Sequence, residues 1–199
     1  MTSFRDQLRP LVMEALIHEP TVLASGRLSS FYFDARMVTL RPDGAYFLAR
    51  HILETVPADS YDAIGGMTMG ADPIAASVAA LSWELGTPKT AFIVRKTPKG
   101  HGRRKRVEGP LAPGARVVVV EDVTTTGGSA LDAIRAVEAE AGCEVVRVVS
   151  LVDRQQGAAR VFDEAGYAFS PVFTAEELGI GREEIDAEAR PGESGAPLR

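Results

Sequence analysis

The chain is poor in the residues that build disulfide bonds and metal centres. Cys143 is its only cysteine among 199 residues, which excludes an internal disulfide and a metal site with several cysteine ligands. The three histidines, His18, His51 and His101, are too scattered to predict a zinc site. Because Cys143 falls between a helical stretch and an apolar strand, we expect it to have only a packing role.

Long apolar runs and a strong net charge are missing as well. No apolar run approaches the roughly 20 residues that span a bilayer, and residues 1–10 lack a charged segment followed by an apolar signal core. The formal net charge of -5 gives no overall attraction to nucleic acid or to an anionic membrane. We therefore expect a cytoplasmic protein without nucleic-acid or membrane partners, in which local basic groups hold any anionic ligand.

From residue 61 onward, short apolar strands alternate with helices. Strands are expected at 63–64, 90–94, 116–120 and 145–152, and helices at 73–85 and 129–141. This alternation predicts an α/β fold with a mostly parallel central sheet flanked by helices. The run Val117–Val120 is apolar at every position, which is typical of a central parallel strand. Ligands of such sheets bind at the carboxyl ends of the strands.

The two ends of the chain have other patterns. Helical spacing at 4–17 and 45–53, with the aromatic run 31–33 between them, predicts an N-terminal cap over residues 1–58. The cap and a core of residues 59–180 form a single domain, 1–180, which suits this length. From Arg182 onward the sequence is rich in charge, Gly and Pro, so segment 181–199 is predicted to be a poorly ordered tail.

A turn of hydroxyl groups and glycines follows the four valines. It comprises Glu121, Asp122, Val123, Thr124, Thr125, Thr126, Gly127, Gly128 and Ser129. Backbone amides and hydroxyls at a helix start favour a phosphate dianion, and glycines let the backbone approach it. Glu121 and Asp122 can accept hydrogen bonds from ribose hydroxyls or hold magnesium through water. The alternative is an acidic turn with an ordinary N-cap.

A basic loop spans residues 95–106, after the strand at 90–94. Seven of its twelve residues are Lys or Arg, so it attracts a polyanion such as pyrophosphate. We expect a mobile loop that closes over the substrate and directs four side chains at the leaving group: Arg95, Lys96, Lys99 and His101. Lys99 or His101 can also protonate that group. A solvated loop, or one that contacts nucleic acid, is the alternative.

Two further segments carry candidate binding residues, and the first of them suits a planar, acidic base. The aromatic rings of Phe31 to Phe33 can cover such a base, and Arg36 can meet a carboxylate. Core packing is an equal alternative for Phe31. Arg154 follows the strand at 145–152 and projects over the same sheet edge; the alternative is an exposed salt bridge with Asp153.

These motifs together resemble the orotate phosphoribosyltransferases, a family of type I phosphoribosyltransferases. The acidic pair and hydroxyl-glycine turn are similar to the family's phosphoribosyl diphosphate signature, and Arg-Lys-x-x-Lys-x-His-Gly at 95–102 is similar to its catalytic loop. Ser-Gly-x-x-Ser-x-x-Tyr-Phe-Asp at 25–34 resembles its base-binding segment, and the glycine-rich turn at 65–73 its pyrophosphate-binding turn. The resemblance covers roughly residues 20–178.

The resemblance implies the type I phosphoribosyltransferase fold and a magnesium-dependent reaction. Orotate and 5-phosphoribosyl 1-diphosphate would give orotidine 5'-monophosphate and pyrophosphate, in the synthesis of UMP. It assigns catalysis to Arg95, Lys96, Lys99, His101 and Asp122. It assigns phosphoribosyl diphosphate to the four loop residues and to Glu121, Asp122, Thr124, Thr125, Thr126, Gly127, Gly128 and Ser129. It assigns orotate to Phe33, Arg36, Thr126 and Arg154, with Arg154 on the carboxylate.

The resemblance further implies a homodimer in which the basic loop acts in the neighbouring subunit's site. Ala24 and Met69 stand where many members have lysine, so those two contacts are not carried over to this chain. Two other functions fit the motifs: a phosphoribosyltransferase for another base, and a ligand-sensing regulator that contacts nucleic acid through the basic loop. Measurable turnover, against retention on nucleic acid at physiological salt, separates an enzyme from a regulator.

Overall fold

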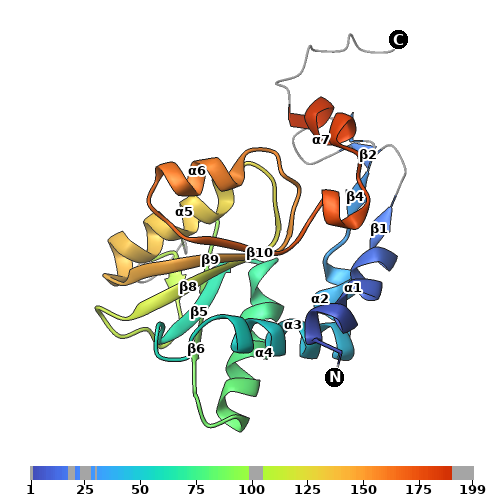
Figure 1. Cartoon of the computed structure of the whole chain (residues 1–199). Coiled ribbons are helices and arrows are strands. Elements are labelled where there is room, and N and C mark those ends of the chain that lie inside the picture. The colour runs from blue at the N-terminus through green and yellow to red at the C-terminus, as the bar shows by residue number, and fades with distance from the viewer. Residues whose placement is uncertain (1, 18–20, 23–27, 30, 99–104, 190–199) are drawn as a thin grey trace.

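A six-stranded sheet forms the centre of the chain (Figure 1). The computed structural model describes residues 2–17, 21–22, 28–29, 31–98 and 105–189. The strand order is β10-β9-β8-β5-β6-β7, and every neighbouring pair is parallel except β6 with β7. The strands are β5 (Ala63–Met67), β6 (Thr90–Val94), β7 (Val107–Glu108), β8 (Arg116–Thr124), β9 (Glu144–Asp153) and β10 (Phe169–Thr174). The mostly parallel α/β sheet is confirmed.

Helices cover both faces of this sheet (Figure 1). On one face lie α5 (Gly128–Ala136), its π-helical continuation Val137–Ala141, and α6 (Ala158–Glu164). The other face is covered by α1 (Phe4–Glu14), α3 (Pro42–Thr55) and α4 (Ala71–Glu84). Val117 and Val119 of β8 belong to the apolar cluster on the α5 face of the sheet. Val118 and Val120 belong to the apolar cluster on the α3 and α4 face. Because alternate side chains of a strand point to opposite faces, this four-valine run is buried on both sides.

The N-terminal elements begin with a capped helix. The Ser3 hydroxyl accepts a hydrogen bond from the Asp6 amide at 3.1 Å, and the Asp6 carboxylate accepts one from the Ser3 amide at 3.2 Å. This capping box satisfies two of the amides that a helix start leaves without partners. The shorter elements of this region are β1 (Leu16–Ile17), β2 (Thr21–Val22), β3 (Leu28–Ser29), β4 (Tyr32–Phe33) and α2 (Arg36–Thr39). Strand β4 pairs with β1, and β3 with β2, both antiparallel. The predicted division into cap and core stays a prediction.

The C-terminal segment differs from its predicted state. After a 3-10 turn at Glu176–Leu178, the chain forms helix α7 (Arg182–Ala189) beside the N-terminal strands (Figure 1). Ile185 is fully buried in an apolar cluster with Phe31, Ala175 and Ile180. The prediction of a poorly ordered tail is therefore wrong for α7, because one buried isoleucine docks a helix whose other residues are charged or alanine. Residues 190–199 lie outside the described part of the chain.

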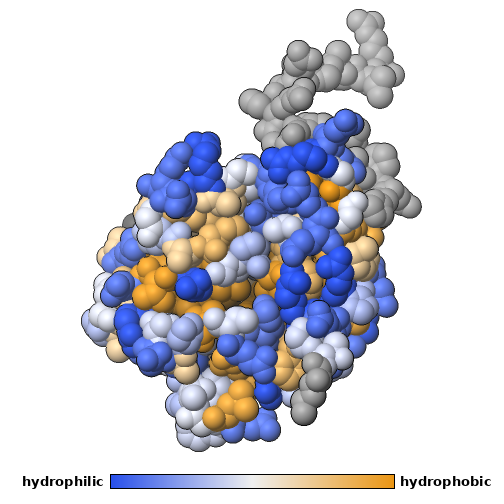
Figure 2. All heavy atoms as spheres, in the orientation of Figure 1, coloured by the Kyte–Doolittle hydropathy of each residue, from blue (hydrophilic) through white to orange (hydrophobic). Residues whose placement is uncertain are grey.

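The surface is mostly hydrophilic on the face that Figure 2 shows, with apolar residues gathered over the β10 edge of the sheet. Among the described helices, none is long and apolar enough to cross a membrane.

Candidate active site

The predicted phosphate loop forms a pocket between β8 and α5. The pocket holds about 180 Å³ and is lined by Glu121, Val123, Thr124, Thr125, Thr126, Gly127, Gly128, Ser129 and Ala130. Gly127 precedes α5 with φ of 82°, in the left-handed region that favours glycine. A Cβ atom there would also lie 3.0 Å from the Phe162 ring of α6. The loop is therefore held close to α6, with the N-terminal amides of α5 at its wall.

Glu121 is the most perturbed acid of this pocket. Its side chain is 6% exposed, and burial, reinforced by the negative charge of Asp122, raises its pKa from 4.5 to about 8 against the opposing charge of Lys96. Among the described residues, neither Glu121 Oε1 nor Thr124 Oγ1 has a hydrogen-bond partner. Both residues line the pocket. Buried polar atoms without partners are costly, and a ligand hydroxyl or phosphate would satisfy them.

Asp122 contacts a different wall of the site. A Cβ atom on Gly70 would lie 2.5 Å from Asp122 Oδ1, so the glycine-rich turn before α4 packs directly against this carboxylate. Burial raises the pKa of Asp122, while the amide of Val123, at 2.8 Å from Oδ1, and the charge of Arg36 oppose that rise. Both acids belong to β8, which runs to Thr124, rather than to the turn beyond it. The contact between Asp122 and Gly70 could not be read from sequence, because 52 positions separate them.

The glycine-rich turn also reaches the start of the basic loop. The Thr68 amide donates to the Val94 carbonyl at 2.9 Å, and the Thr68 hydroxyl donates to Asp72 at 2.6 Å. Helix α4 begins at Ala71 with Gly70 as its N-cap, two residues before the predicted start at residue 73. Met69, at one of the positions where many members have lysine, is 73% exposed.

Arg106 braces the base of the basic loop. Its guanidinium makes a two-pronged contact with Asp132 of α5, with Nη1 to Oδ1 at 3.1 Å, and its Nε donates to the Arg95 carbonyl at 2.8 Å. Its amide donates to Glu140 of the π-helical turn at 2.7 Å. The Arg95 side chain is ion-paired with Glu108 at 3.4 Å. The loop's stem is therefore fixed to the helix whose first turn forms the phosphate pocket.

The described residues include only the two ends of the predicted catalytic loop. Arg95 is partly buried, and the exposed Lys96 lies near enough to Glu121 to lower the pKa of that carboxyl. Lys99, His101 and the rest of 99–104 lie outside the described residues. Their assigned roles stay predictions.

Arg154 is buried at the same sheet edge. Its amide donates to the Thr124 carbonyl at 2.8 Å, which places it beside the phosphate loop. Its guanidinium carbon lies 4.2 Å from the centre of the Phe31 ring, and Nη2 donates to the Phe31 carbonyl at 3.4 Å. Asp153 accepts instead from the Gln155 amide at 2.8 Å, and burial raises the pKa of Asp153. The alternative of an exposed Asp153–Arg154 salt bridge is wrong, since each residue is 3% exposed.

The other residues assigned to orotate occupy different environments. Thr126 lines the phosphate pocket. Arg36 is exposed and ion-paired with Asp34 at 3.0 Å. Phe33 is 5% exposed and packs in the main apolar cluster, while Phe31, for which core packing was the equal alternative, is 2% exposed beneath Arg154. These residues keep their assignments as predictions.

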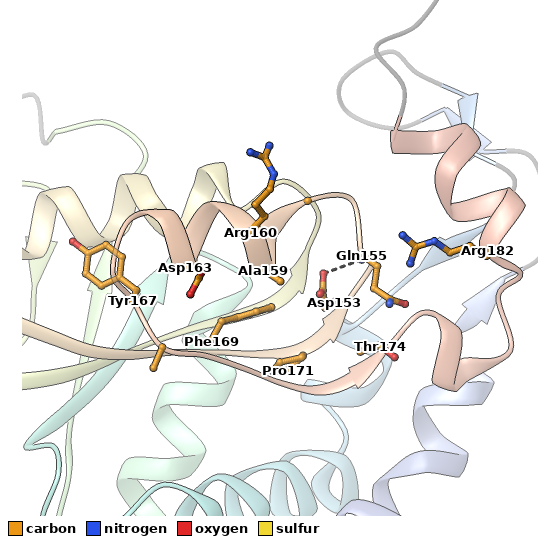
Figure 3. A pocket seen from close by; sticks show the side chains of 12 residues that line it. Asp153, Gln155, Ala159, Arg160, Asp163, Tyr167, Phe169, Pro171, Thr174 and Arg182 are labelled. Carbon is orange, nitrogen blue, oxygen red and sulfur yellow. Dashed lines mark hydrogen bonds between the residues drawn. The ribbon is translucent and has the colours of Figure 1, made fainter.

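A second cavity, which the sequence did not predict, lies on the α6 side of Arg154. It holds about 600 Å³ between α6 and β10, and Figure 3 shows the Asp153–Gln155 contact and the side chain of Arg182 beside it. Arg160 and Asp163 project from α6 at its rim (Figure 3). Helix α6 and strand β10, which enclose it, had no clear signal in the sequence.

Comparison with known proteins agrees with this arrangement. A family model described as the phosphoribosyl transferase domain matches residues 44–171. The orotate phosphoribosyltransferase of Bradyrhizobium sp. (strain ORS 278) is 48% identical over 160 residues, which cover 78% of this chain and 86% of that protein.

Solved structures give the same result. The Mycobacterium tuberculosis H37Rv orotate phosphoribosyltransferase in complex with Fe(III) dicitrate has a TM-score of 0.78 and 39% identity, covering 89% of this chain and 99% of that chain. The same enzyme in complex with 5-phospho-alpha-D-ribosyl 1-diphosphate has a TM-score of 0.74 and 37% identity, again covering 89% and 99%. The fold is that of the type I phosphoribosyltransferases, and the chain belongs to the phosphoribosyl transferase domain family, among its orotate phosphoribosyltransferases.

Proposed function

We propose that this chain transfers the phosphoribosyl group of 5-phosphoribosyl 1-diphosphate to orotate, releasing pyrophosphate and forming orotidine 5'-monophosphate for UMP synthesis. One observation carries the proposal: the Arg154 amide donates to the Thr124 carbonyl at 2.8 Å. That bond joins a phosphate-binding turn to a buried arginine at one sheet edge. A phosphate ester and an acidic base would thus meet there. The structure of the M. tuberculosis relative with phosphoribosyl diphosphate supports the first of these ligands.

The phosphate pocket receives the 5-phosphate of the donor. The loop from Thr124 to Ser129 supplies hydroxyls and the free amides of α5, which favour a dianion. Glu121 and Asp122 face the ribose hydroxyls from two walls. Burial raises the pKa of Glu121 to about 8 in the ligand-free chain, so this carboxyl can donate as well as accept a hydrogen bond there.

Mg2+ is the expected cofactor, and the donors present suit it. Within the described residues, no three His, Cys, Asp or Glu side chains gather as a metal site. A cation here would take its ligands chiefly from the diphosphate, the ribose and water, as Mg2+ commonly does. Glu121 and Asp122 would hold those waters or hydroxyls, and the Glu121 Oε1 atom is buried without a partner. When bound, Mg2+ neutralises charge on the diphosphate.

The basic loop stabilises the leaving group. Substitution at the anomeric carbon passes through an oxocarbenium-like state, so catalysis depends on neutralising the pyrophosphate and aligning the attacking nitrogen. Arg95, Lys96, Lys99 and His101 carry the positive charge for this task, and Lys99 or His101 supplies a proton to the pyrophosphate oxygen. Arg106 and Asp132 hold the loop's stem against α5.

The base binds over the acidic edge of the sheet beside Arg154. The Arg154 guanidinium meets the orotate carboxylate, with Thr126 beside it and Arg36 at the rim. Phe33, which packs in the main apolar cluster, shapes the base site through that packing. The working unit is a homodimer that exchanges basic loops between its two sites, in the cytoplasm.

The test follows orotate absorbance as phosphoribosyl diphosphate and Mg2+ are added. We expect orotate to be consumed, and Lys99→Ala to lower kcat by about 100-fold or more, since it removes a charge that acts on the leaving group. The matched control is Lys105→Ala, which removes a loop lysine whose Nζ donates to the Glu140 carbonyl at 3.3 Å. Uracil, adenine, guanine, hypoxanthine and xanthine are assayed in parallel. Turnover of one of these instead of orotate contradicts the base assignment, and no turnover with any base favours a regulator.

A further inference from the structure

Helix α7 shares an apolar cluster with Phe31, which lies against the buried arginine that the proposed function places on the base. Ile185 of α7 is fully buried in the cluster that contains Phe31. The Phe31 ring in turn lies 4.2 Å from the Arg154 guanidinium, and the Phe31 carbonyl accepts from Arg154 Nη2 at 3.4 Å. An apolar connection therefore runs from the C-terminal helix to the arginine.

A polar connection runs from α7 to Gln155, the residue that follows this arginine. Arg182, the first residue of α7, is ion-paired with Glu176 at 3.3 Å. The Glu176 carboxylate accepts from the Gln155 side-chain amide at 3.0 Å, and the Glu176 backbone amide donates to the Gln155 side-chain oxygen at 2.9 Å. Gln155 follows Arg154 directly and has a φ of 57°, a conformation that non-glycine residues adopt only when their surroundings hold it.

We propose that α7 positions Arg154, so that the C-terminal helix sets the affinity for the carboxylate of the base far more than the affinity for phosphoribosyl diphosphate. Ile185 acts through Phe31, and Arg182 acts through Glu176 and Gln155. Neither residue lines the phosphate pocket. Both are therefore positioning residues for the base.

The physical reason is the geometry that a guanidinium needs. A two-pronged contact with a carboxylate requires a fixed plane and direction, and a displacement of about 1 Å at a binding group costs up to about 100-fold in rate. Phe31 fixes the plane of the Arg154 guanidinium, and Gln155 fixes the backbone that carries it. Loosening α7 releases both restraints.

The inference rests on the proposed function, and the test separates the two. Steady-state kinetics with orotate and phosphoribosyl diphosphate are measured for the full-length wild-type chain, Ile185→Ala and Arg182→Ala. The controls are Ile52→Ala, which deletes the same atoms from a buried position in the main cluster, and Arg160→Ala, which removes an exposed ion pair on α6. Thermal unfolding checks that each variant is folded. Arg182→Ala, whose side chain is 59% exposed, keeps the test valid if Ile185→Ala does not fold.

We expect Ile185→Ala to raise the KM for orotate about 10-fold and Arg182→Ala to raise it about 3-fold, with the KM for phosphoribosyl diphosphate changed less than about 2-fold. Ile185→Val restores most of the orotate affinity. In an Arg154→Ala background, Ile185→Ala adds less than about 2-fold, because both changes act on one interaction.

Three results overturn the inference. The first is an active wild type in which Ile185→Ala and Arg182→Ala leave the KM for orotate unchanged. The second is an equal rise in both KM values, matched by Ile52→Ala, which indicates general loosening. The third is full additivity with Arg154→Ala. A wild type that does not consume orotate refutes the proposed function itself, and the inference with it.

Discussion

Glu121 makes the stability of the ligand-free protein depend on pH. Burial raises its pKa from 4.5 in an ordinary setting to about 8 in the folded chain. Between these values the folded state binds a proton that the unfolded state has released. The resulting stabilisation is complete below pH 4.5 and is lost as pH rises through 8. The shift corresponds to roughly 5 kcal/mol as an upper limit, and about 2 to 4 kcal/mol is the expected effect once the site relaxes and takes up water.

Glu121→Gln removes this titration while keeping the shape of the side chain. Urea unfolding at intervals from pH 5 to pH 9, in EDTA and without phosphate, gives the free energy of unfolding of wild type and variant. We expect the free energy of unfolding of the variant, relative to that of the wild type, to increase by about 2 to 4 kcal/mol as pH rises across this range. Glu84→Gln, at an exposed position near the end of α4, provides the control and changes with pH as the wild type does. A difference between Glu121→Gln and wild type that stays constant from pH 5 to pH 9 refutes the reasoning.

Three further substitutions test other parts of the site. Gly127→Ala puts a Cβ atom 3.0 Å from the Phe162 ring, on a residue whose φ is 82°. We expect urea titration to show a loss of about 1 to 3 kcal/mol in unfolding free energy. Kinetics should show a higher KM for phosphoribosyl diphosphate. Arg106→Ala frees the basic loop's stem from Asp132, and we expect it to lower kcat by about 10-fold. An unchanged kcat would contradict the proposal that Arg106 holds the stem in place for catalysis. Ser3→Ala breaks the α1 capping box and lowers the unfolding free energy by about 1 kcal/mol with both KM values unchanged.

Local patterns in the sequence are sufficient to predict the central sheet and the phosphate turn of the protein. The run Val117–Val120 is apolar on both faces because helices cover both sides of β8. This continuous apolar run can be seen directly in the sequence. The hydroxyl-glycine turn after β8 is also a local signal, since one short segment provides the whole phosphate pocket. Elements of this kind can be predicted from a single segment of the sequence.

Contacts between distant segments had no such signal. Gly70 meets Asp122 only because β5 and β8 are neighbours in the sheet, and no spacing encodes that approach. The stacking of Arg154 on Phe31 joins positions 123 residues apart. The sequence does not predict helix α7, because one isoleucine, Ile185, gives no apolar period. Burial of this side chain in the cluster with Phe31 is enough to dock the helix.

The selectivity for orotate over uracil tests the central claim most directly, because the two bases differ by the carboxylate that Arg154 is proposed to bind. The measurement compares the ratio of kcat/KM values for the two bases in the wild type and in Arg154→Ala, with phosphoribosyl diphosphate and Mg2+ saturating. The account predicts a wild type that prefers orotate by about 1000-fold or more, and a variant in which that ratio falls by at least about 100-fold. A ratio that is unchanged by Arg154→Ala, or a wild type that uses uracil as well as orotate, contradicts it.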